Sequence, residues 1–200
     1  MSELRVESAL ANVQPHQGGA IAIREIAGRG MIDLRGLTSD RKFMAAAKEA
    51  LGVELPKAPR TSVTWGDMRV LWLSVDQWLV LTTADKADAL TTALRKALGT
   101  LHSMATNVSD MRAVIRVEGA GARVALMKGC SLDLLGGEYT AGTARRMRFA
   151  EIAALVHVAE DDVFDIYVFR SYAEYAWNFL LATCRDAAVV KVFGKQAVNV

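Results

Sequence analysis

The sequence predicts an α+β fold with antiparallel sheets backed by helices, in which the two halves of the chain have the same order of elements. Segments typical of strands and helices follow one another as strand, helix, hairpin, helix, and this order occurs twice in 200 residues. Hydrophobic residues make up 52% of the chain, enough for a substantial core. We therefore expect one domain at 20–200, with pseudo-repeats at 20–100 and 105–200, preceded by an N-terminal arm at 1–19.

The first half begins with a strand and a helix. Isoleucines give Ala20–Ala27 the β-branched bulk of a strand, and Gly28 and Gly30 are expected to end it. A helix is expected next, because Thr38–Asp40 offers capping side chains and apolar residues then recur at helical spacing up to Gly52.

A hairpin and a second helix complete the first half. Ser62–Trp65 and Met68–Ser74 have the composition of strands around a tight turn, and Trp78–Thr83 is expected to pair with the second strand. Both faces of Arg69–Ser74 and Trp78–Thr82 are apolar, which predicts cover on both sides by a helix layer or by another chain. A helix is expected at Asp85–Leu98. Its predicted buried face consists of Ala89, Leu90, Ala93, Leu94 and Ala97.

The second half repeats this order. Apolar residues alternate along Met111–Val117, which predicts a half-exposed strand, and Gly119–Lys128 is expected to form a short helix. Ala144–Phe149 is expected to be extended. Ile152–Val158 and Phe164–Phe169 have the pattern of a hairpin.

The last predicted helix opens with Ser171 and Glu174, which have the spacing of a capping box. In such a box each side chain accepts a hydrogen bond from an exposed backbone amide of the first turn. The predicted buried face consists of Ala173, Ala176, Trp177, Leu180, Leu181 and Cys184.

Charge and composition exclude several classes of protein. The 24 Lys and Arg residues nearly balance the 22 Asp and Glu residues, so a nucleic-acid partner is not expected. The charged residues Glu3, Arg5 and Glu7 interrupt the apolar core that a signal peptide needs. No apolar run reaches the ~20 residues that a membrane span requires. Cys130 and Cys184 are too few for a disulfide framework. We therefore expect a cytoplasmic protein without a membrane partner.

Local motifs for chemistry are missing from the sequence. His16, His102 and His157 are far apart and do not have the spacing of two metal ligands on one helix. The turn at Gly119–Gly121 lacks the third glycine and the lysine of nucleotide-binding loops, and the acidic run Glu160–Asp162 is typical of a solvated turn. We therefore predict no catalytic, cofactor-binding or metal-binding residue in this chain.

One basic cluster has two interpretations. In a strand, Arg146 and Arg148 share a face, with Met147 and Phe149 opposite. The face is either merely solvated or it binds an anion or an acidic partner surface, because arginine is enriched at protein interfaces. Arg146 and Arg148 are therefore the candidate interface residues.

Four stretches carry a resemblance to a known family. They are LSVDQWLVL at Leu73–Leu81, NVSDMRAVIR at Asn107–Arg116, GAGARVALMKGCSLDL at Gly119–Leu134 and FRSYAEYAWNFLLA at Phe169–Ala182. Through them the chain resembles the gamma subunit of heterotetrameric bacterial sarcosine oxidases. The resemblance extends from about Leu73 to Asp186.

The resemblance implies a fold similar to the folate-binding domain of aminomethyltransferases and a non-catalytic role in assembly. The implied partners are the alpha, beta and delta subunits. Such a complex demethylates sarcosine to glycine, yielding hydrogen peroxide and either formaldehyde or methylene-tetrahydrofolate. The implied cofactors of the complex are FAD, FMN, NAD, zinc and tetrahydrofolate, and none of them is expected on this chain.

Two alternatives stay open at this point. Val75, Gln77 and Ser131 depart from the pattern of the family, which leaves room for a gamma-like subunit of a related N-methyl amino acid dehydrogenase. The other alternative is a stand-alone folate-binding enzyme of the aminomethyltransferase type. That enzyme needs a carboxylate to hold the pterin ring, and Asp110 or Asp133 is the candidate.

Overall fold

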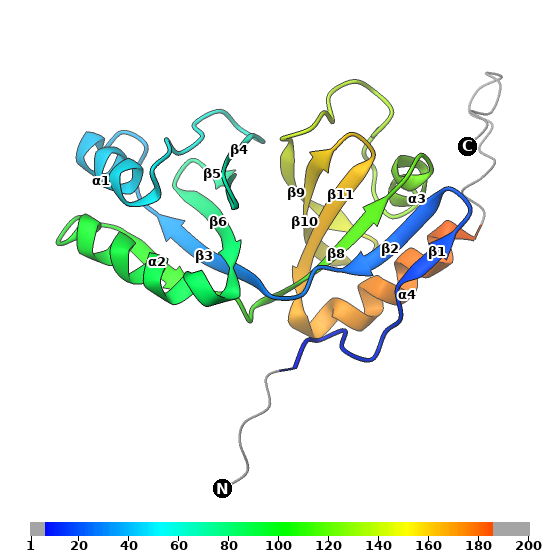
Figure 1. The fold of residues 1–200 in the computed structure, drawn as a ribbon. Helices are drawn as coiled ribbons and strands as arrows, with labels where there is room; N and C mark the ends of the chain where they lie inside the picture. The colour runs from blue at the N-terminus through cyan, green and yellow to red at the C-terminus, as the bar shows by residue number, and fades with distance from the viewer. Residues whose placement is uncertain (1–6, 186–200) are drawn as a thin grey trace, which may run out of the picture. The chain divides into compact units, whose positions relative to one another are not determined.

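The computed structural model describes residues 7–185, which form two compact units (Figure 1). Unit 2 consists of Gly28–Met111 and Gly142–Arg146, and unit 1 contains the other described residues. The chain therefore passes from unit 1 into unit 2 twice, at Gly28 and at Gly142, and returns to unit 1 each time. The predicted domain at 20–200 and its pseudo-repeats stay a prediction. The two compact units divide the chain at other positions.

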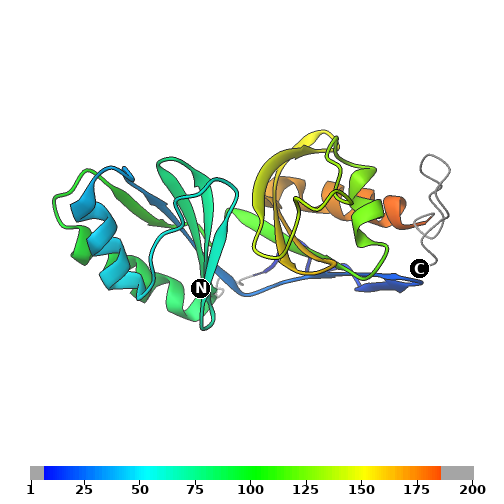
Figure 2. The same ribbon diagram turned by 90° about the horizontal axis from the view of Figure 1, so that it is seen from above.

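Unit 2 is a five-stranded antiparallel sheet with two helices on one face (Figures 1 and 2). Its strand order is β4-β5-β6-β3-β7. The strands are β3 (Arg29–Arg35), β4 (Ser62–Trp65), β5 (Met68–Ser74), β6 (Gln77–Thr83) and β7 (Met104–Asn107). The helices are α1 (Arg41–Leu51) and α2 (Ala84–Leu98). Phe43 of α1 packs on Trp78 of β6 with ring centroids 5.8 Å apart, so the core lies between sheet and helices.

The predicted ends of α1 are confirmed. The Asp40 carboxylate accepts hydrogen bonds from the backbone amides of Lys42 (2.8 Å) and Phe43 (3.2 Å). Gly52 ends the helix at a φ of 72°, a left-handed conformation that favours glycine.

The predicted buried face of α2 is wrong in part. Ala89 and Ala93 are exposed, whereas the buried side chains are Ala87, Thr91, Leu94 and Leu98. Thr91 is buried because its hydroxyl donates a 2.7 Å hydrogen bond to the carbonyl of Ala87, one turn earlier. The spacing of the small apolar residues did not predict which face of α2 is buried, because the polar side chain of Thr91 belongs to the core.

Strand β3 was not predicted, because Gly28 and Gly30 were expected to end an extended run. Gly28 does make the turn, with a φ of 69°. Gly30 instead lies inside β3 opposite Thr82, where an added Cβ would be 2.4 Å from the carbonyl oxygen of Thr83. This glycine permits a close approach of two strands and does not end one.

Unit 1 is a six-stranded sheet in the order β1-β2-β8-β11-β10-β9 (Figure 1). Its strands are β1 (His16–Gly18), β2 (Ile21–Glu25), β8 (Arg112–Glu118), β9 (Ala144–Phe149), β10 (Ile152–Glu160) and β11 (Val163–Phe169). The helices are α3 (Ala122–Met127) and α4 (Ala173–Cys184), which follows a 3-10 turn at Arg170–Tyr172. The predicted α+β class is confirmed. Strands β1 and β7, of three and four residues, were not predicted.

The predicted capping box of α4 is wrong. Residues 170–172 form the 3-10 turn, so the α-helix begins after Ser171, and no side chain caps its first turn. Ala176, Trp177 and Leu180 are buried as predicted. Leu181 and Cys184 are half-buried, and Thr183 is buried instead.

One arginine ties the long loop after α3 to the rest of unit 1. The Arg123 guanidinium donates to Asp162 Oδ1 (2.6 Å) and to the carbonyls of Leu134 (2.7 Å) and Tyr139 (3.0 Å). It also lies over the Phe164 ring, 5.3 Å from the centroid. The loop therefore has a defined path to β9, which carries the candidate interface residues.

Gly30→Ala is expected to lower the free energy of unfolding by about 1–3 kcal/mol, because the new methyl group overlaps a carbonyl of β6. Gly137→Ala is the control, since a Cβ there meets nothing within 4 Å. Urea denaturation of the purified full chain measures both variants. Equal stability of the two variants would contradict the close approach of β3 and β6.

Candidate functional site

Strand β9 presents the candidate arginines to solvent. Arg146 and Arg148 are exposed, Met147 is half-buried and Phe149 is buried. The Phe149 ring meets Phe179 of α4 edge to face, with centroids 5.4 Å apart. Arg146 and Arg148 therefore share the outer face of β9, as strand alternation predicts.

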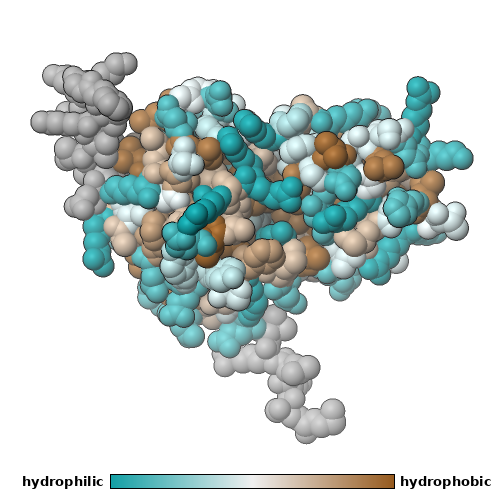
Figure 3. Space-filling view, turned by 180° about the vertical axis from the view of Figure 1, so that it is seen from behind, coloured by the Kyte–Doolittle hydropathy of each residue, from teal (hydrophilic) through white to brown (hydrophobic). Residues whose placement is uncertain are grey.

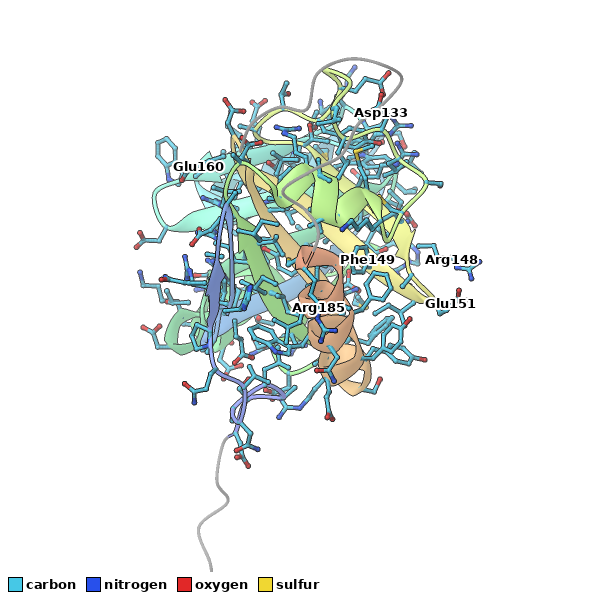
Figure 4. The ribbon with its side chains drawn as sticks, turned by 90° about the vertical axis from the view of Figure 1, so that its right-hand side faces the viewer. Asp133, Arg148, Phe149, Glu151, Glu160 and Arg185 are labelled. Carbon is cyan, nitrogen blue, oxygen red and sulfur yellow. The ribbon has the colours of Figure 1, made fainter. Side chains whose placement is uncertain are left out.

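Arg148 interacts with neighbouring residues of its own hairpin. Its Nε donates a 2.9 Å hydrogen bond to the carbonyl of Ala150, and its guanidinium forms an ion pair with Glu151 (Figure 4). Both charged side chains are at least 70% exposed, so water and salt screen the pair. Much of the charge of Arg148 is thus balanced locally.

Arg146 lies at an open depression in unit 2 with a volume of about 440 Å³. Residues from three segments line it: Arg60, Trp72, Leu73, Ser74, Val75, Ala144, Arg145 and Arg146. The sequence analysis missed Arg60, because it lies far from β9 in the sequence and in a segment without a motif. Only the fold brings these arginines together.

Backbone hydrogen bonds hold the walls of this depression. The amide of Ala144 donates to the carbonyl of Arg60 (2.9 Å), and the amide of Trp72 donates to the carbonyl of Thr61 (3.0 Å). Thr61 and Thr143 also form an isolated antiparallel bridge. The segment at Arg60 is therefore fixed on both sides.

One carboxylate lies near these arginines. Asp76, in the turn between β5 and β6, accepts a hydrogen bond from the Ser74 hydroxyl, and this bond lowers the pKa of Asp76. The positive charges of Arg35 and Arg146 lower the pKa further. Asp76 is thus held as an anion at neutral pH.

The polar face of the unit 1 sheet holds a buried ion pair. Asp165 of β11 is fully buried and accepts two hydrogen bonds from the Arg116 guanidinium, at 2.7 and 2.9 Å. The bond to Asp165 raises the pKa of Arg116. Arg24 and His157 flank the pair in the same row across the sheet. His157 is buried in β10, a position that fits a structural histidine.

The other polar candidates lie in turns. Asp110 is exposed, and the carboxylate of Asp133 accepts hydrogen bonds from the amides of Leu135 (3.0 Å) and Gly136 (3.1 Å) in an exposed turn (Figure 4). Both side chains are exposed, whereas a bound pterin ring needs a concave, largely apolar site. Among residues 7–185, no group of three or more His, Cys, Asp or Glu side chains is placed to hold a metal ion.

Glycine and cysteine residues that suggested chemistry have packing roles. An added Cβ at Gly119 would lie 2.1 Å from the carbonyl oxygen of Ala20, so Gly119 permits a close strand-to-helix turn. Cys130 and Cys184 are half-buried thiols beside the unit 1 core and form no disulfide. Burial raises the pKa of Cys184, which favours the protonated, unreactive thiol.

Aromatic side chains are exposed where β11 leads into α4. Phe169, Tyr172 and Tyr175 are each 40–45% exposed, and the Arg112 guanidinium lies 5.4 Å from the centroid of Phe169. Tyr175 stacks on Phe179 with centroids 6.3 Å apart. Figure 3 shows hydrophobic residues among hydrophilic ones on the face seen from behind. Exposed aromatic residues beside an arginine have the composition of a protein interface.

The comparisons with known proteins agree with one another. A family model described as the sarcosine oxidase, gamma subunit family matches residues 35–188. The sarcosine oxidase subunit gamma of Corynebacterium sp. (strain U-96) is 28% identical over 176 residues, which cover 86% of this chain and 83% of that protein. A chain of the heterotetrameric sarcosine oxidase from Corynebacterium sp. U-96, solved with pyrrole 2-carboxylate, aligns with a TM-score of 0.85 and 25% identity. That alignment covers 94% of this chain and 98% of the other.

A more distant likeness concerns the fold alone. The glycine cleavage system aminomethyltransferase T from Bartonella henselae aligns with a TM-score of 0.60 and 16% identity. The alignment covers 81% of this chain and 45% of the aminomethyltransferase. The predicted similarity of the fold to aminomethyltransferases is confirmed. In the described part of the chain, no helix is both long and apolar enough to cross a bilayer.

Asp165→Asn is expected to lower the free energy of unfolding by about 3 kcal/mol, because Arg116 keeps its charge in a largely buried site without an anionic partner. Lys86→Ala is the control, since it removes an exposed 3.4 Å pair with Asp67 and is expected to cost under about 1 kcal/mol. Urea denaturation of the full chain measures both. A loss no larger for Asp165→Asn than for the control would show that the pair does not stabilise the sheet.

Proposed function

Because the chain belongs to the sarcosine oxidase gamma subunit family, we propose that it is the gamma subunit of a heterotetrameric sarcosine oxidase. The observation that carries this proposal is the nearly full-length alignment with a chain of such an enzyme, at a TM-score of 0.85. In this proposal the subunit has a structural role in assembly. Its partners are the alpha, beta and delta subunits.

The complex would oxidise sarcosine in the cytoplasm. Sarcosine, oxygen and water would yield glycine, hydrogen peroxide and formaldehyde. With tetrahydrofolate, sarcosine and oxygen would instead yield glycine, hydrogen peroxide and methylene-tetrahydrofolate. FAD, FMN, NAD and zinc are assigned to the other subunits. This chain contributes surface, and its own residues are assigned no step of the reaction.

The extent of the alignments favours a subunit over a stand-alone folate enzyme. The match covers 98% of the sarcosine oxidase chain but 45% of the aminomethyltransferase. The surroundings of Asp110 and Asp133 also argue against a pterin site, since both lie in exposed turns. A related dehydrogenase would differ in its substrate-binding subunit, so the whole complex must be assayed to identify the substrate.

The two candidate interface arginines differ in what surrounds them. Arg148 is paired with Glu151 within its own hairpin, whereas Arg146 lines a depression with two further arginines. We therefore assign the stronger partner contact to Arg146. An arginine without a strong local ion pair gains more from a carboxylate on a partner.

Affinity purification of the tagged full chain from its native cells is expected to recover three further subunits and a flavin absorbance spectrum. The recovered complex is expected to form hydrogen peroxide with sarcosine, and N-methylglutamate and dimethylglycine serve as competing substrates. The same tag on an unrelated protein is the control. Recovery of a colourless chain by itself, or saturable micromolar binding of tetrahydrofolate to that chain, would contradict a purely structural subunit.

A further inference from the structure

We propose that the depression lined by Arg60, Arg145 and Arg146 receives an acidic segment of a partner subunit. This inference rests on the proposed function and goes beyond it, because it assigns one surface of the chain and the chemistry of its partner. Three of the eight lining residues are arginines and none is acidic. A carboxylate matches the planar fork of a guanidinium group, which can donate two parallel hydrogen bonds to it.

The walls combine charge with apolar surface. Trp72 and Leu73 of β5 contribute apolar groups, and Val75 stands 70% exposed in the turn that follows. An acidic side chain that binds the arginines therefore brings its neighbouring residues onto apolar surface. Arginine and aromatic residues are the types that contribute most to binding at protein interfaces.

The backbone that carries the arginines is held in place before a partner binds. Ala144 donates its amide to the carbonyl of Arg60, and Trp72 donates its amide to the carbonyl of Thr61, so the backbones of the three walls are joined. The Ser62 hydroxyl also donates a 2.8 Å hydrogen bond to the carbonyl of Gly142. A surface whose backbone is already fixed loses less conformational entropy on binding.

Two carboxylates near the depression lie beside Arg35 or Arg146. Asp76 faces Arg35 and Arg146, and its carboxylate also accepts a hydrogen bond from Ser74. The Arg35 guanidinium lies 3.8 Å from the Asp33 carboxylate. That carboxylate also accepts two hydrogen bonds from the side-chain amide of Gln77. Arg146 thus faces one carboxylate, which also faces Arg35, while the lining of the depression holds three arginines and no acidic residue.

The same strand supplies a matched control. Arg148 lies two residues beyond Arg146 on the same exposed face of β9, but Glu151 already pairs with it. It does not line the depression. A general attraction between β9 and an acidic partner would involve both arginines, whereas the proposed site requires Arg146.

Zero-length cross-linking of the whole complex tests the site. In the R146K variant a carbodiimide can join the introduced amine to a carboxylate as an amide, with loss of water. We expect mass spectrometry to find position 146 linked to an Asp or Glu of another subunit. The control variant R148K is expected to link to Glu151 of the same chain, and R60K provides a second position in the depression.

The outcomes separate this inference from the proposed function. A four-subunit complex in which positions 60 and 146 link only to Asp76, or to nothing, would overturn the acidic-segment site and leave the gamma-subunit proposal intact. A chain that purifies without any other subunit would overturn both. An inter-subunit link at either position supports the site.

Charge reversal provides an independent measurement. R146E is expected to weaken binding of the chain to the remaining subunits about tenfold at low salt, and the difference should shrink as ionic strength rises. R148E is expected to change the dissociation constant less than about twofold. Arg148 already belongs to an ion pair at the surface, where water and salt screen the charges. Equal effects of R146E and R148E would overturn the site.

Discussion

The pairing of β2 with β8 is the constraint on which unit 1 depends. These strands come from opposite sides of the segment that forms most of unit 2, and they pair antiparallel from Ala22 with Glu118 to Glu25 with Ile115. The amide of Ile26 extends the ladder with a 2.9 Å hydrogen bond to the carbonyl of Val114. Strand β8 can then pair on its other side with β11, which completes a sheet from distant parts of the chain.

This sheet explains how several polar residues contribute to the fold. Asp165 is buried because β8 places Arg116 directly opposite it. Arg123 is similarly engaged with Asp162 and with two loop carbonyls. Arg146, to which we assign a partner contact, lies at the start of β9, where the chain leaves unit 2. A subunit that contributes surface needs a stable sheet at which to present that strand.

Local pairing decides which exposed arginine is available. Alternation along β9 puts Arg146 and Arg148 on one face, and the sequence alone treats them alike. The turn after β9 brings Glu151 to Arg148, whereas Arg146 meets Arg60, which comes from the loop before β4. The ion pair of Arg148 is set within its own turn, whereas the depression at Arg146 depends on backbone hydrogen bonds between segments far apart in the chain.

The sequence by itself determined features that depend on neighbouring residues. The cap at Asp40, the stop at Gly52 and the alternation along β9 were predictable, because each is set within a few residues of chain. Features that depend on distant partners were not. Gly30 was misread because the carbonyl it approaches belongs to another strand, and a glycine that ends a strand has the same sequence as one that lets two strands meet.

The tertiary structure alone decided the division into two units and the depression at Arg60. The sequence of β2 does not by itself encode a preference for β8. The two strands pair because both are buried in one core. The arginines of the depression are likewise gathered by long-range backbone pairing at Thr61 and Thr143. Contacts between residues far apart in the chain are settled by packing, for which local pattern carries no information.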